Sequence, residues 1–312
     1  MVSVMRFYFA ALMSCALSFF CPLAPALAES HDRIVVASKI DIEGALLGSI
    51  ILLILEQAKV PVESRLRLGP TRVVRIALLA GDIDVYPEYT GNGALFFDKS
   101  DEHVWGSPDD AYKLVKHLDR ERNNLVWLDP SPANNVWAIA VRSDLAGRER
   151  LATMEDFARF ANSGGHLRLA ASSEFVESPA ALPAFQRTYG FELAPEQIQR
   201  KPGGDSSATM HAAAENEKGV NCAMVYGTDG TVQMSGLVLM ADPKGAQIAY
   251  QPSAVMRATV LEKFPEIGPR ISKAFRSLTL AWLRKMNVEV AKEGRTPRDV
   301  ARDYLIAQRV LH

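Results

Sequence analysis

The sequence predicts an α/β protein with two lobes. Short apolar runs of strand length alternate with helical patterns in residues 33–86, and the same alternation returns in residues 136–240. The last quarter, residues 260–309, is almost entirely helical by period, with stops at Gly268-Pro269, Gly294 and Pro297. Because strands that alternate with helices form mainly parallel sheets flanked by helices, each of the two segments predicts one such sheet.

The first segment predicts three strands and two helices. The strands are residues 33–37, 62–68 and 83–86, and the first helix carries apolar side chains from Leu46 to Leu55. Either Asp41 or Ser38 is placed to cap that helix. The second helix, residues 73–80, follows a Gly-Pro-Thr turn and ends at a glycine, which is a common helix stop.

The second segment repeats this order and completes the domain plan. Its predicted strands are residues 136–141, 167–171, 221–226 and 237–240, and its predicted helices are residues 154–158, 180–189 and 208–217. We expect residues 29–134 and 241–312 to form lobe 1, and residues 135–240 to form lobe 2. The chain then crosses between the lobes near Asn134-Asn135 and after Met240. A ligand cleft is expected between the lobes, at the carboxyl ends of strands.

The first 28 residues have the pattern of a secretory signal peptide. Arg6 precedes an apolar run over residues 7–20, and Ala26-Leu27-Ala28 matches an A-x-A cleavage site. A membrane anchor is the alternative, but the run is short for a span and prolines follow it. A lipoprotein anchor has weaker support, because bulky phenylalanines precede Cys21. Cleavage after Ala28 leaves Cys222 as the one cysteine, so no internal disulfide is possible.

Composition and motifs argue against several classes of function. Lys and Arg total 35 against 36 Asp and Glu, a balance that gives no support for nucleic acid or a polybasic membrane contact. No metal or cofactor is predicted, because His103, His117, His166 and His211 lack metal-site spacing. No G-x-S-x-G elbow or P-loop occurs, so no catalytic residues are assigned and an enzyme is not expected.

Two polar clusters admit a structural role as well as a functional one. Residues 203–207, Gly-Gly-Asp-Ser-Ser, precede a helix and either bind an anion through backbone N–H groups or simply cap that helix. Asp82, Asp84 and Glu88 have the composition of an acid–base set, but charged residues beside a strand end are usually solvated or capping.

Four aromatic residues fall at or near strand ends in loop-rich contexts: Tyr89, Trp137, Tyr226 and Tyr250. Each one taken alone is more typical of a core than of a ligand site. Aromatic faces that converge on one point make an electronegative box, which suits a cation that cannot donate hydrogen bonds. A quaternary ammonium is the clearest such cation, so the sequence suggests a site for one.

Four blocks of sequence carry a family resemblance. They are VASK at residues 36–39, GDIDVYPEYTG at 81–91, PANNVWA at 132–138 and YGTDG at 226–230. In this order they resemble the osmoprotectant-binding proteins of ABC importers, of the glycine betaine, choline and carnitine type, over nearly the whole mature chain. The resemblance implies a two-lobed periplasmic-binding-protein fold of type II and a periplasmic, non-enzymatic monomer. Its implied partners are a quaternary amine and the membrane permease.

The resemblance also implies a set of ligand-binding residues. The family's aromatic cage falls on Tyr89, Trp137, Tyr226 and Tyr250, and its lysine, which pairs with a ligand carboxylate, falls on Lys39. Asn92 stands where the family has a threonine that contacts the same carboxylate, and an amide N–H can still donate there. Tyr86, Asp84 and Glu88 are expected to be structural.

One departure from the family affects the choice of ligand. Betaine binders tend to have an arginine near position 178, whereas this chain has Ser178 with Glu177 beside it. The loss of a charge-assisted bond predicts weak betaine binding or a different cationic ligand, such as choline or carnitine. Two rival functions stay open at this point: a sensor that reports occupancy without transport, and an enzyme on the same fold.

Overall fold

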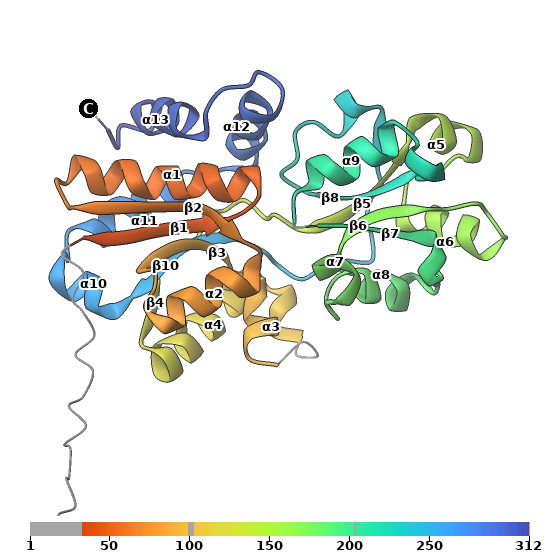
Figure 1. Cartoon of the computed structure of the whole chain (residues 1–312). Coiled ribbons are helices and arrows are strands. Elements are labelled where there is room, and N and C mark those ends of the chain that lie inside the picture. Colours follow the sequence, from red (N-terminus) through yellow and green to blue (C-terminus); the bar gives the residue numbers. More distant parts are fainter. Residues whose placement is uncertain (1–32, 99–102, 203, 312) are drawn as a thin grey trace, which may run out of the picture. The chain divides into compact units, whose positions relative to one another are not determined.

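The computed structural model describes residues 33–98, 103–202 and 204–311 (Figure 1). The predicted signal peptide, residues 1–28, lies outside the described residues. The described chain forms one compact unit that contains two five-stranded sheets flanked by helices. The α/β architecture with two sheets, predicted from the alternation of strand and helix patterns, is therefore confirmed.

The first sheet has the strand order β2-β1-β3-β10-β4. Its strands are β1 (Ile34–Lys39), β2 (Val62–Gly69), β3 (Val85–Tyr89), β4 (Leu125–Trp127) and β10 (Pro252–Arg257). Strand β1 pairs in parallel with β2 and β3, whereas β10 runs antiparallel to both β3 and β4. The sheet is mixed because β10 enters it from the far end of the chain, after the chain has built the second sheet.

Helices cover both faces of this first sheet (Figure 1). One face carries α1 (Ile42–Gln57), over which α12 (Leu280–Ala291) and α13 (Pro297–Ala307) pack, so thirteen of the sixteen α1 residues are buried. The opposite face carries α2 (Thr71–Ala80), α3 (Gly93–Phe96) and α4 (Pro108–Asn123). The remaining helices of the C-terminal tail are α10 (Ala258–Lys263) and α11 (Ile267–Arg276).

The second sheet has the order β7-β6-β8-β5-β9. Its strands are β5 (Trp137–Arg142), β6 (Leu169–Ser172), β7 (Ile198–Lys201), β8 (Cys222–Tyr226) and β9 (Leu237–Leu239). Its helices are α5 (Ser143–Glu149), α6 (Met154–Asn162), α7 (Ser173–Glu177), α8 (Leu182–Tyr189) and α9 (Ser206–Ala214). Figure 1 shows α9 on one face and α6, α7 and α8 on the other. This sheet is mixed too, because β5 is antiparallel to β8 and β9.

Short 3₁₀ turns complete the described structure. They are η1 (Thr90–Asn92), η2 (His103–Gly106), η3 (Pro195–Gln197), η4 (Glu217–Gly219) and η5 (Gln233–Ser235). Turn η1 matters most for function, because it follows β3 directly and redirects the chain beyond Tyr89.

Several element boundaries differ from the sequence prediction for local reasons. Strand β3 begins two residues late, at Val85, because the Asp84 carboxylate accepts the Val35 N–H at 2.9 Å just before it. Helix α9 begins at Ser206, since Asp205 caps it by accepting the Ser207 N–H at 2.9 Å. The chain passes between the sheets after β4 and again after β9, and the lobe boundaries at residues 134 and 241 stay a prediction.

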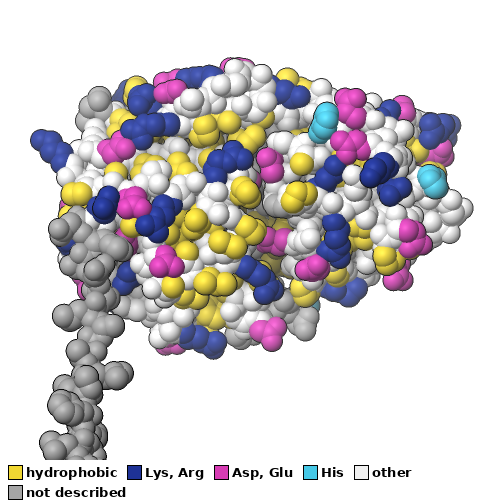
Figure 2. All heavy atoms as spheres, in the orientation of Figure 1, with side chains coloured by type: hydrophobic (Ala, Val, Ile, Leu, Met, Phe, Trp, Pro, Cys, Tyr) yellow, Lys and Arg dark blue, Asp and Glu magenta, His cyan; other side chains and the backbone are white. Residues whose placement is uncertain are grey.

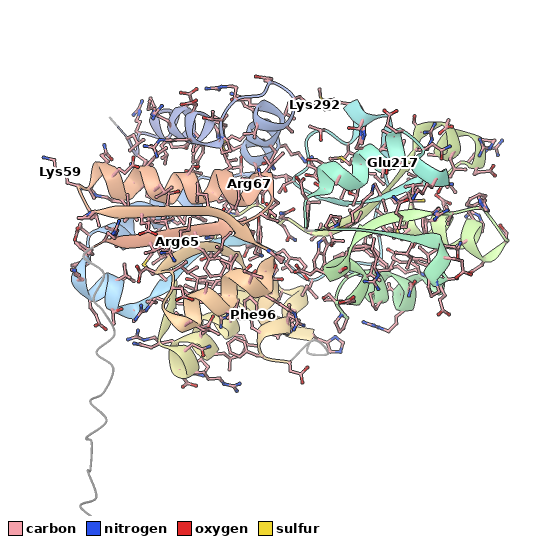
Figure 3. All side chains as sticks on the ribbon, in the orientation of Figure 1. Lys59, Arg65, Arg67, Phe96, Glu217 and Lys292 are labelled. Atoms are coloured by element: carbon pink, nitrogen blue, oxygen red, sulfur yellow. The ribbon has the colours of Figure 1, made fainter. Side chains whose placement is uncertain are left out.

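Apolar, basic and acidic side chains are interspersed on the face of the molecule that Figure 2 shows. Strand β2 is an edge strand, and Arg65 and Arg67 stand on it, as Figure 3 shows. Charged side chains on an edge strand discourage unwanted pairing with another chain. The exposed large apolar residues next to them are Leu68, Val73, Ile76 and Leu79. Among the described residues, no helix combines the length and apolarity that crossing a membrane requires.

Candidate functional site

A pocket of about 840 Å³, counting its open mouth, is lined by residues from both sheets and from the crossing segments. All six residues singled out in the sequence line this one pocket: Lys39, Tyr89, Asn92, Trp137, Tyr226 and Tyr250. The structure therefore brings together residues that are more than two hundred positions apart in the chain. Their part in ligand binding stays a prediction.

Three of the four aromatic residues predicted to form the cage lie at strand ends. Tyr89 is the last residue of β3, while Trp137 begins β5 and pairs directly with Tyr226 at the end of β8. Tyr250 lies in the crossing segment just before β10, where its N–H donates to the Asn134 side chain at 2.7 Å. Because these strands end at the pocket, their terminal aromatic rings are delivered to it.

Two of the four rings, Trp137 and Tyr250, pack against each other, and Tyr89, Trp137 and Tyr250 are buried. The Trp137 and Tyr250 ring centroids are 5.2 Å apart at 57°, and Phe175 meets Trp137 edge-on at 5.9 Å. Burial raises the pKa of the Tyr89, Tyr226 and Tyr250 phenols well above their ordinary value, so these groups stay neutral. Neutral aromatic faces around a desolvated space can stabilise a cation there.

Two hydrogen bonds hold Tyr226 in place. The Tyr226 hydroxyl donates to the Gly204 carbonyl at 3.0 Å, and the Tyr226 N–H is accepted by Asp229 at 2.7 Å. The buried Trp137 indole N–H makes no well-formed hydrogen bond among the described residues, but it interacts with the Tyr226 phenol and acts to lower the pKa of that group, against the larger effect of burial.

Lys39 is already paired within the protein. Its ammonium lies 2.5 Å from a Glu88 carboxylate oxygen and 4.6 Å from the centre of the Tyr89 ring. The Lys39 side chain is 8% exposed and that of Glu88 is fully buried. The expected role of Lys39 toward a ligand carboxylate must therefore be shared with a bond to Glu88.

Asn92 is held by the same acid. Its amide donates to Glu88 at 2.7 Å, and the Tyr89 N–H donates to the same oxygen at 2.7 Å. The second Glu88 oxygen accepts the Tyr86 hydroxyl at 2.9 Å. Glu88 and Tyr86 thus form a buried support behind Lys39 and Asn92, in the structural role that the sequence suggested for them.

Sequence reasoning missed Glu43, which is the most connected acid of the pocket. Its buried carboxylate accepts the Tyr89 hydroxyl at 2.8 Å, the Asn135 amide at 2.9 Å and the Asn287 amide at 2.7 Å. Burial raises the pKa of Glu43, while these three donors favour its ionised form. Asn135 in turn accepts the Thr228 hydroxyl at 2.8 Å, so the network reaches the turn after β8.

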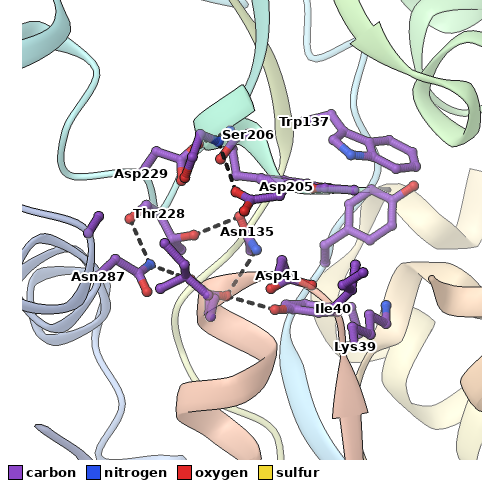
Figure 4. Close-up of a pocket in the computed structure, with 18 of the residues that line it drawn as sticks. Lys39, Ile40, Asp41, Asn135, Trp137, Asp205, Ser206, Thr228, Asp229 and Asn287 are labelled. Carbon is purple, nitrogen blue, oxygen red and sulfur yellow. Dashed lines mark hydrogen bonds between the residues drawn. The ribbon is translucent and has the colours of Figure 1, made fainter. Parts of the chain in front are cut away.

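The lining of the pocket is acidic. It contains Asp41, Glu43, Glu174, Asp205 and Asp229, and Lys39 is the one basic residue among the described residues that line it. Figure 4 shows Asp41, Asp205 and Asp229 around Asn135. Such a lining attracts cations and repels anions. Burial raises the pKa of Asp229 to about 7 and also raises the pKa of Asp41.

Two of these acids cap helices. Asp41 accepts the Gly44 N–H at 2.6 Å at the start of α1, which decides between the two predicted caps. Asp205 caps α9, so residues 204–207 have the capping role, one of the two that the sequence admitted. Gly203 lies outside the described residues. A carboxylate at that helix start makes it unsuited to an anion.

The region where betaine binders tend to have an arginine is occupied by acidic residues. Glu174 lies in the first turn of α7, lines the pocket and accepts the Thr71 hydroxyl at 2.9 Å. Burial raises the pKa of Glu174. Glu177, at the end of the same helix, is exposed and pairs with Arg200 at 2.7 Å, away from the pocket. Among the described residues, no cluster of three metal-binding side chains is present.

Comparison with known proteins gives this fold and pocket a class. Residues 32–307 match the family described as the substrate-binding domain of the ABC-type glycine betaine transport system. The chain belongs to this family of transport proteins, which are not enzymes. The predicted resemblance to osmoprotectant-binding proteins is thereby confirmed.

Particular relatives support the same assignment. The glycine betaine-binding protein YehZ of Escherichia coli is 47% identical over 277 residues, which cover 89% of this chain and 91% of that protein. The solved structure of apo YehZ has a TM-score of 0.66 at 46% identity and covers 89% of this chain and 99% of its own. Lactococcal OpuAC, solved in a closed form with glycine betaine, shares the fold at 13% identity, with a TM-score of 0.60 and coverage of 89% and 96%.

Proposed function

We propose that this protein captures a quaternary-amine osmolyte in the periplasm, with glycine betaine as the first candidate, and delivers it to an ABC permease. Family membership and the names of the relatives support the class of ligand. The export signal predicted at residues 1–28 supports the location, and the monomeric state predicted from the resemblance fits a carrier that diffuses to its permease.

The observation that carries this proposal is the convergence of Tyr89, Trp137, Tyr226 and Tyr250 on one acidic pocket. A quaternary ammonium has no N–H to donate, so polar side chains cannot compensate its loss of water, whereas aromatic faces can. The nearby carboxylates add attraction for the positive charge over a longer range. No covalent chemistry is needed: binding and release are sufficient for the function.

The structure also gives a reason to expect modest affinity for betaine. The one basic side chain among the described residues of the lining is Lys39, and its charge is paired with Glu88. The family tends to have, in addition, an arginine near position 178, which this chain lacks. The Asn92 amide, which also donates to Glu88, lines the pocket as a neutral donor for a ligand carboxylate. Loss of one charge-assisted bond costs about 1.5–3 kcal/mol, which is one to two decades of affinity.

Calorimetric titration tests the function directly. The mature protein is unfolded, stripped of ligand and refolded, and then titrated with glycine betaine, choline and carnitine separately. Saturable binding of at least one quaternary amine is expected. If betaine binds and choline does not, Lys39 acts toward the carboxylate; if choline alone binds, the cage remains and that role is discarded. If none binds, the proposal is wrong.

Aromatic variants test the cage itself. Trp137→Ala and Tyr226→Ala should each weaken binding by about 2 kcal/mol, or roughly thirtyfold, because each removes a desolvated cation–π face. Tyr112→Ala is the control, since the Tyr112 hydroxyl contacts Trp127 and Lys116 and its ring does not line the pocket. Parent-like titration of all three variants would remove the cage from the proposal.

A further inference from the structure

The acidic residues at one end of the pocket raise a problem for any ligand that carries a carboxylate. Lys39 and Asn92 mark the expected place of that carboxylate, yet Glu174 and Asp41 line the same pocket and interact electrostatically with Lys39. With Glu88 already bonded to Lys39, one ammonium faces three carboxylates there before a ligand arrives. A fourth negative charge in this partly desolvated space would be strongly unfavourable.

Glu174 is placed to resolve this conflict. Its half-buried side chain accepts a hydrogen bond from one neutral donor, the Thr71 hydroxyl, at 2.9 Å. This bond is compatible with both protonation states of Glu174, because the proton of a neutral carboxyl group can sit on the oxygen that Thr71 does not contact. A protonated Glu174 would donate a hydrogen bond to a ligand carboxylate instead of repelling it. That donor would stand in the region where the family tends to have its arginine.

The other acids of the lining accept backbone or amide donors, which favour their ionised forms and oppose the burial that raises the pKa of Asp41 and Glu43. Asp41 and Asp205 accept N–H groups at helix starts, where an ionised carboxylate is favoured. Glu43 accepts three donors. Asp229 accepts the Tyr226 N–H at 2.7 Å, and because burial raises its pKa to about 7 it competes with Glu174 for a proton.

The charged and titratable groups around Glu174 come from every neighbouring element. They are Lys39 of β1, Asp41 before α1, Arg72 of α2, Glu88 of β3, Glu177 of α7 itself, Tyr226 of β8 and Tyr250 before β10. Arg72 is exposed and shares an adjoining hollow with Glu174, while Glu177 is paired with Arg200. Acids outnumber bases in the pocket itself, so the surroundings favour uptake of a proton when a further anion enters.

We propose that a quaternary amine with a carboxylate binds in this pocket together with one proton, which Glu174 takes up from solvent, whereas a quaternary amine without a carboxylate binds without one. This inference rests on the proposed function of the pocket. Glu174 is then a specificity-determining residue, which makes the affinity for betaine, but not for choline, depend on pH.

The sign of this dependence follows from linkage. Burial already raises the pKa of Glu174 in the free protein, and a bound carboxylate raises it further. Betaine affinity therefore increases as the pH falls through the range between the pKa of Glu174 in the complex and its lower pKa in the free protein. The increase is at most about tenfold per pH unit, and the affinity is constant below the pKa of the free protein. Choline affinity stays level or decreases over the same range, because protonation removes an attractive charge.

Titration calorimetry in pairs of buffers with different ionisation enthalpies counts the protons directly. At a pH between the pKa of Glu174 in the free protein and its pKa in the complex, the mature protein should take up a proton with glycine betaine, approaching one per ligand, and none with choline. Glu174→Gln keeps an acceptor for Thr71 and so should fold. It should abolish the proton uptake and bind betaine roughly tenfold more tightly at a pH where Glu174 of the free parent protein is ionised, because the repulsion is gone.

Two further variants make the result decisive. Glu177→Gln, three residues away but directed to Arg200, should titrate like the parent with both ligands. Asp229→Asn should keep the proton uptake. Three outcomes would overturn the inference and leave the proposed function intact. They are betaine binding without proton uptake, weaker betaine binding by Glu174→Gln, and loss of the proton uptake in Asp229→Asn alone. If the parent binds neither ligand, the proposed function fails, and this inference fails with it.

Discussion

At the scale of single residues, the buried pair of Lys39 and Glu88 decides how the end of the pocket behaves. Two charges that are almost fully buried stabilise a protein little as a pair, but removal of one partner leaves the other uncompensated. Glu88 has three further donors that depend on its position, from Tyr86, Tyr89 and Asn92. The pair therefore holds β3 and η1 in place. The Lys39 ammonium has this structural role in addition to its predicted contact with a ligand carboxylate.

A double-mutant cycle measures this structural role. Lys39→Met should lower the free energy of unfolding by about 3–5 kcal/mol, because it strands the Glu88 charge in the interior. Lys39→Met combined with Glu88→Gln should recover a large part of that loss. Urea unfolding followed by circular dichroism provides the four stabilities.

The pair of Lys201 and Glu217 is the matched control. Its N–O distance is 2.6 Å, but its side chains are 18% and 34% exposed, so Lys201→Met should cost less than about 1 kcal/mol. If Lys39→Met is as mild as Lys201→Met, the buried pair is not structural, and Lys39 is free to serve the ligand alone.

How far the site could be predicted depends on the distance between partners in the sequence. The four cage aromatics stand in short local motifs, so the sequence alone selected the residues that line one pocket. Glu43 gave no such signal, because its partner Asn287 is 244 positions away. An isolated glutamate near a helix start is ordinary helix chemistry, and only the folded chain shows what it contacts.

At the scale of elements, the 3₁₀ turn η1 links the strand that delivers Tyr89 to the segment that delivers Tyr250. A Cβ atom added at Gly91 would lie 2.6 Å from the Ala249 carbonyl oxygen and 2.8 Å from the Tyr250 ring. The backbone of the crossing segment and one wall of the cage thus lie directly on this glycine. Its lack of a side chain, and not an unusual φ angle, is what the turn requires.

Gly91→Ala is therefore expected to disturb stability and binding together. It should lower the free energy of unfolding by about 1–3 kcal/mol, since neither the backbone nor the packed ring can move freely. It should also weaken binding of the quaternary amine by on the order of 1 kcal/mol, through displacement of the Tyr250 ring. Thermal unfolding and calorimetric titration give the two quantities.

Gly147→Ala provides the comparison. Gly147 lies in α5 with no atom within 4 Å of the added Cβ, so alanine there should stabilise the protein by about 0.5–1 kcal/mol and leave binding unchanged. A Gly91→Ala variant that behaves like Gly147→Ala would mean that the turn is more yielding than its contacts imply.

The elements that sequence reasoning missed have identifiable causes. Strand β10 begins with Pro252, and a proline inside an apolar run argues against a strand, although it is tolerated as the first residue. Helix α4 is polar over most of its length, so the search for apolar periodicity passed over it. Its start was readable from Ser107, which accepts the Asp110 N–H, and from Pro108 in the first turn. The antiparallel direction of β10 and β5 could not be predicted either, because an apolar pattern does not show which way a strand runs in its sheet.

At the scale of the whole molecule, helix α12 connects the two halves of the pocket. It belongs to the C-terminal tail that packs beside α1, yet Arg284 donates twice, at 3.0 and 2.8 Å, to the Gly227 carbonyl in the turn after β8. Asn287 donates to Glu43 at 2.7 Å and to the Thr228 carbonyl at 3.2 Å. The order of strand patterns predicted that the tail returns to the first half of the chain, but not that it would hold the turn of the second sheet.

Asn287→Ala tests whether α12 couples the two sheets. The variant leaves Glu43 with one donor fewer in a buried place, which should cost about 1–3 kcal/mol of stability. Hydrogen exchange followed by mass spectrometry should show faster exchange in residues 226–230 and at Asn135, as well as in the first turn of α1. Binding of the quaternary amine should weaken in parallel, because Tyr89 donates to Glu43 and Tyr226 directly precedes the turn whose Thr228 carbonyl accepts the Asn287 amide.

The control for this coupling is Arg302→Ala in α13. The Arg302 guanidinium pairs with Asp299 one turn earlier in the same helix, so its loss should change exchange in none of these segments. A faster exchange in Asn287→Ala that is confined to α12 and α1, with residues 226–230 still protected, would contradict the coupling. The two sheets would then be held together by the crossing segments and not by the C-terminal helix.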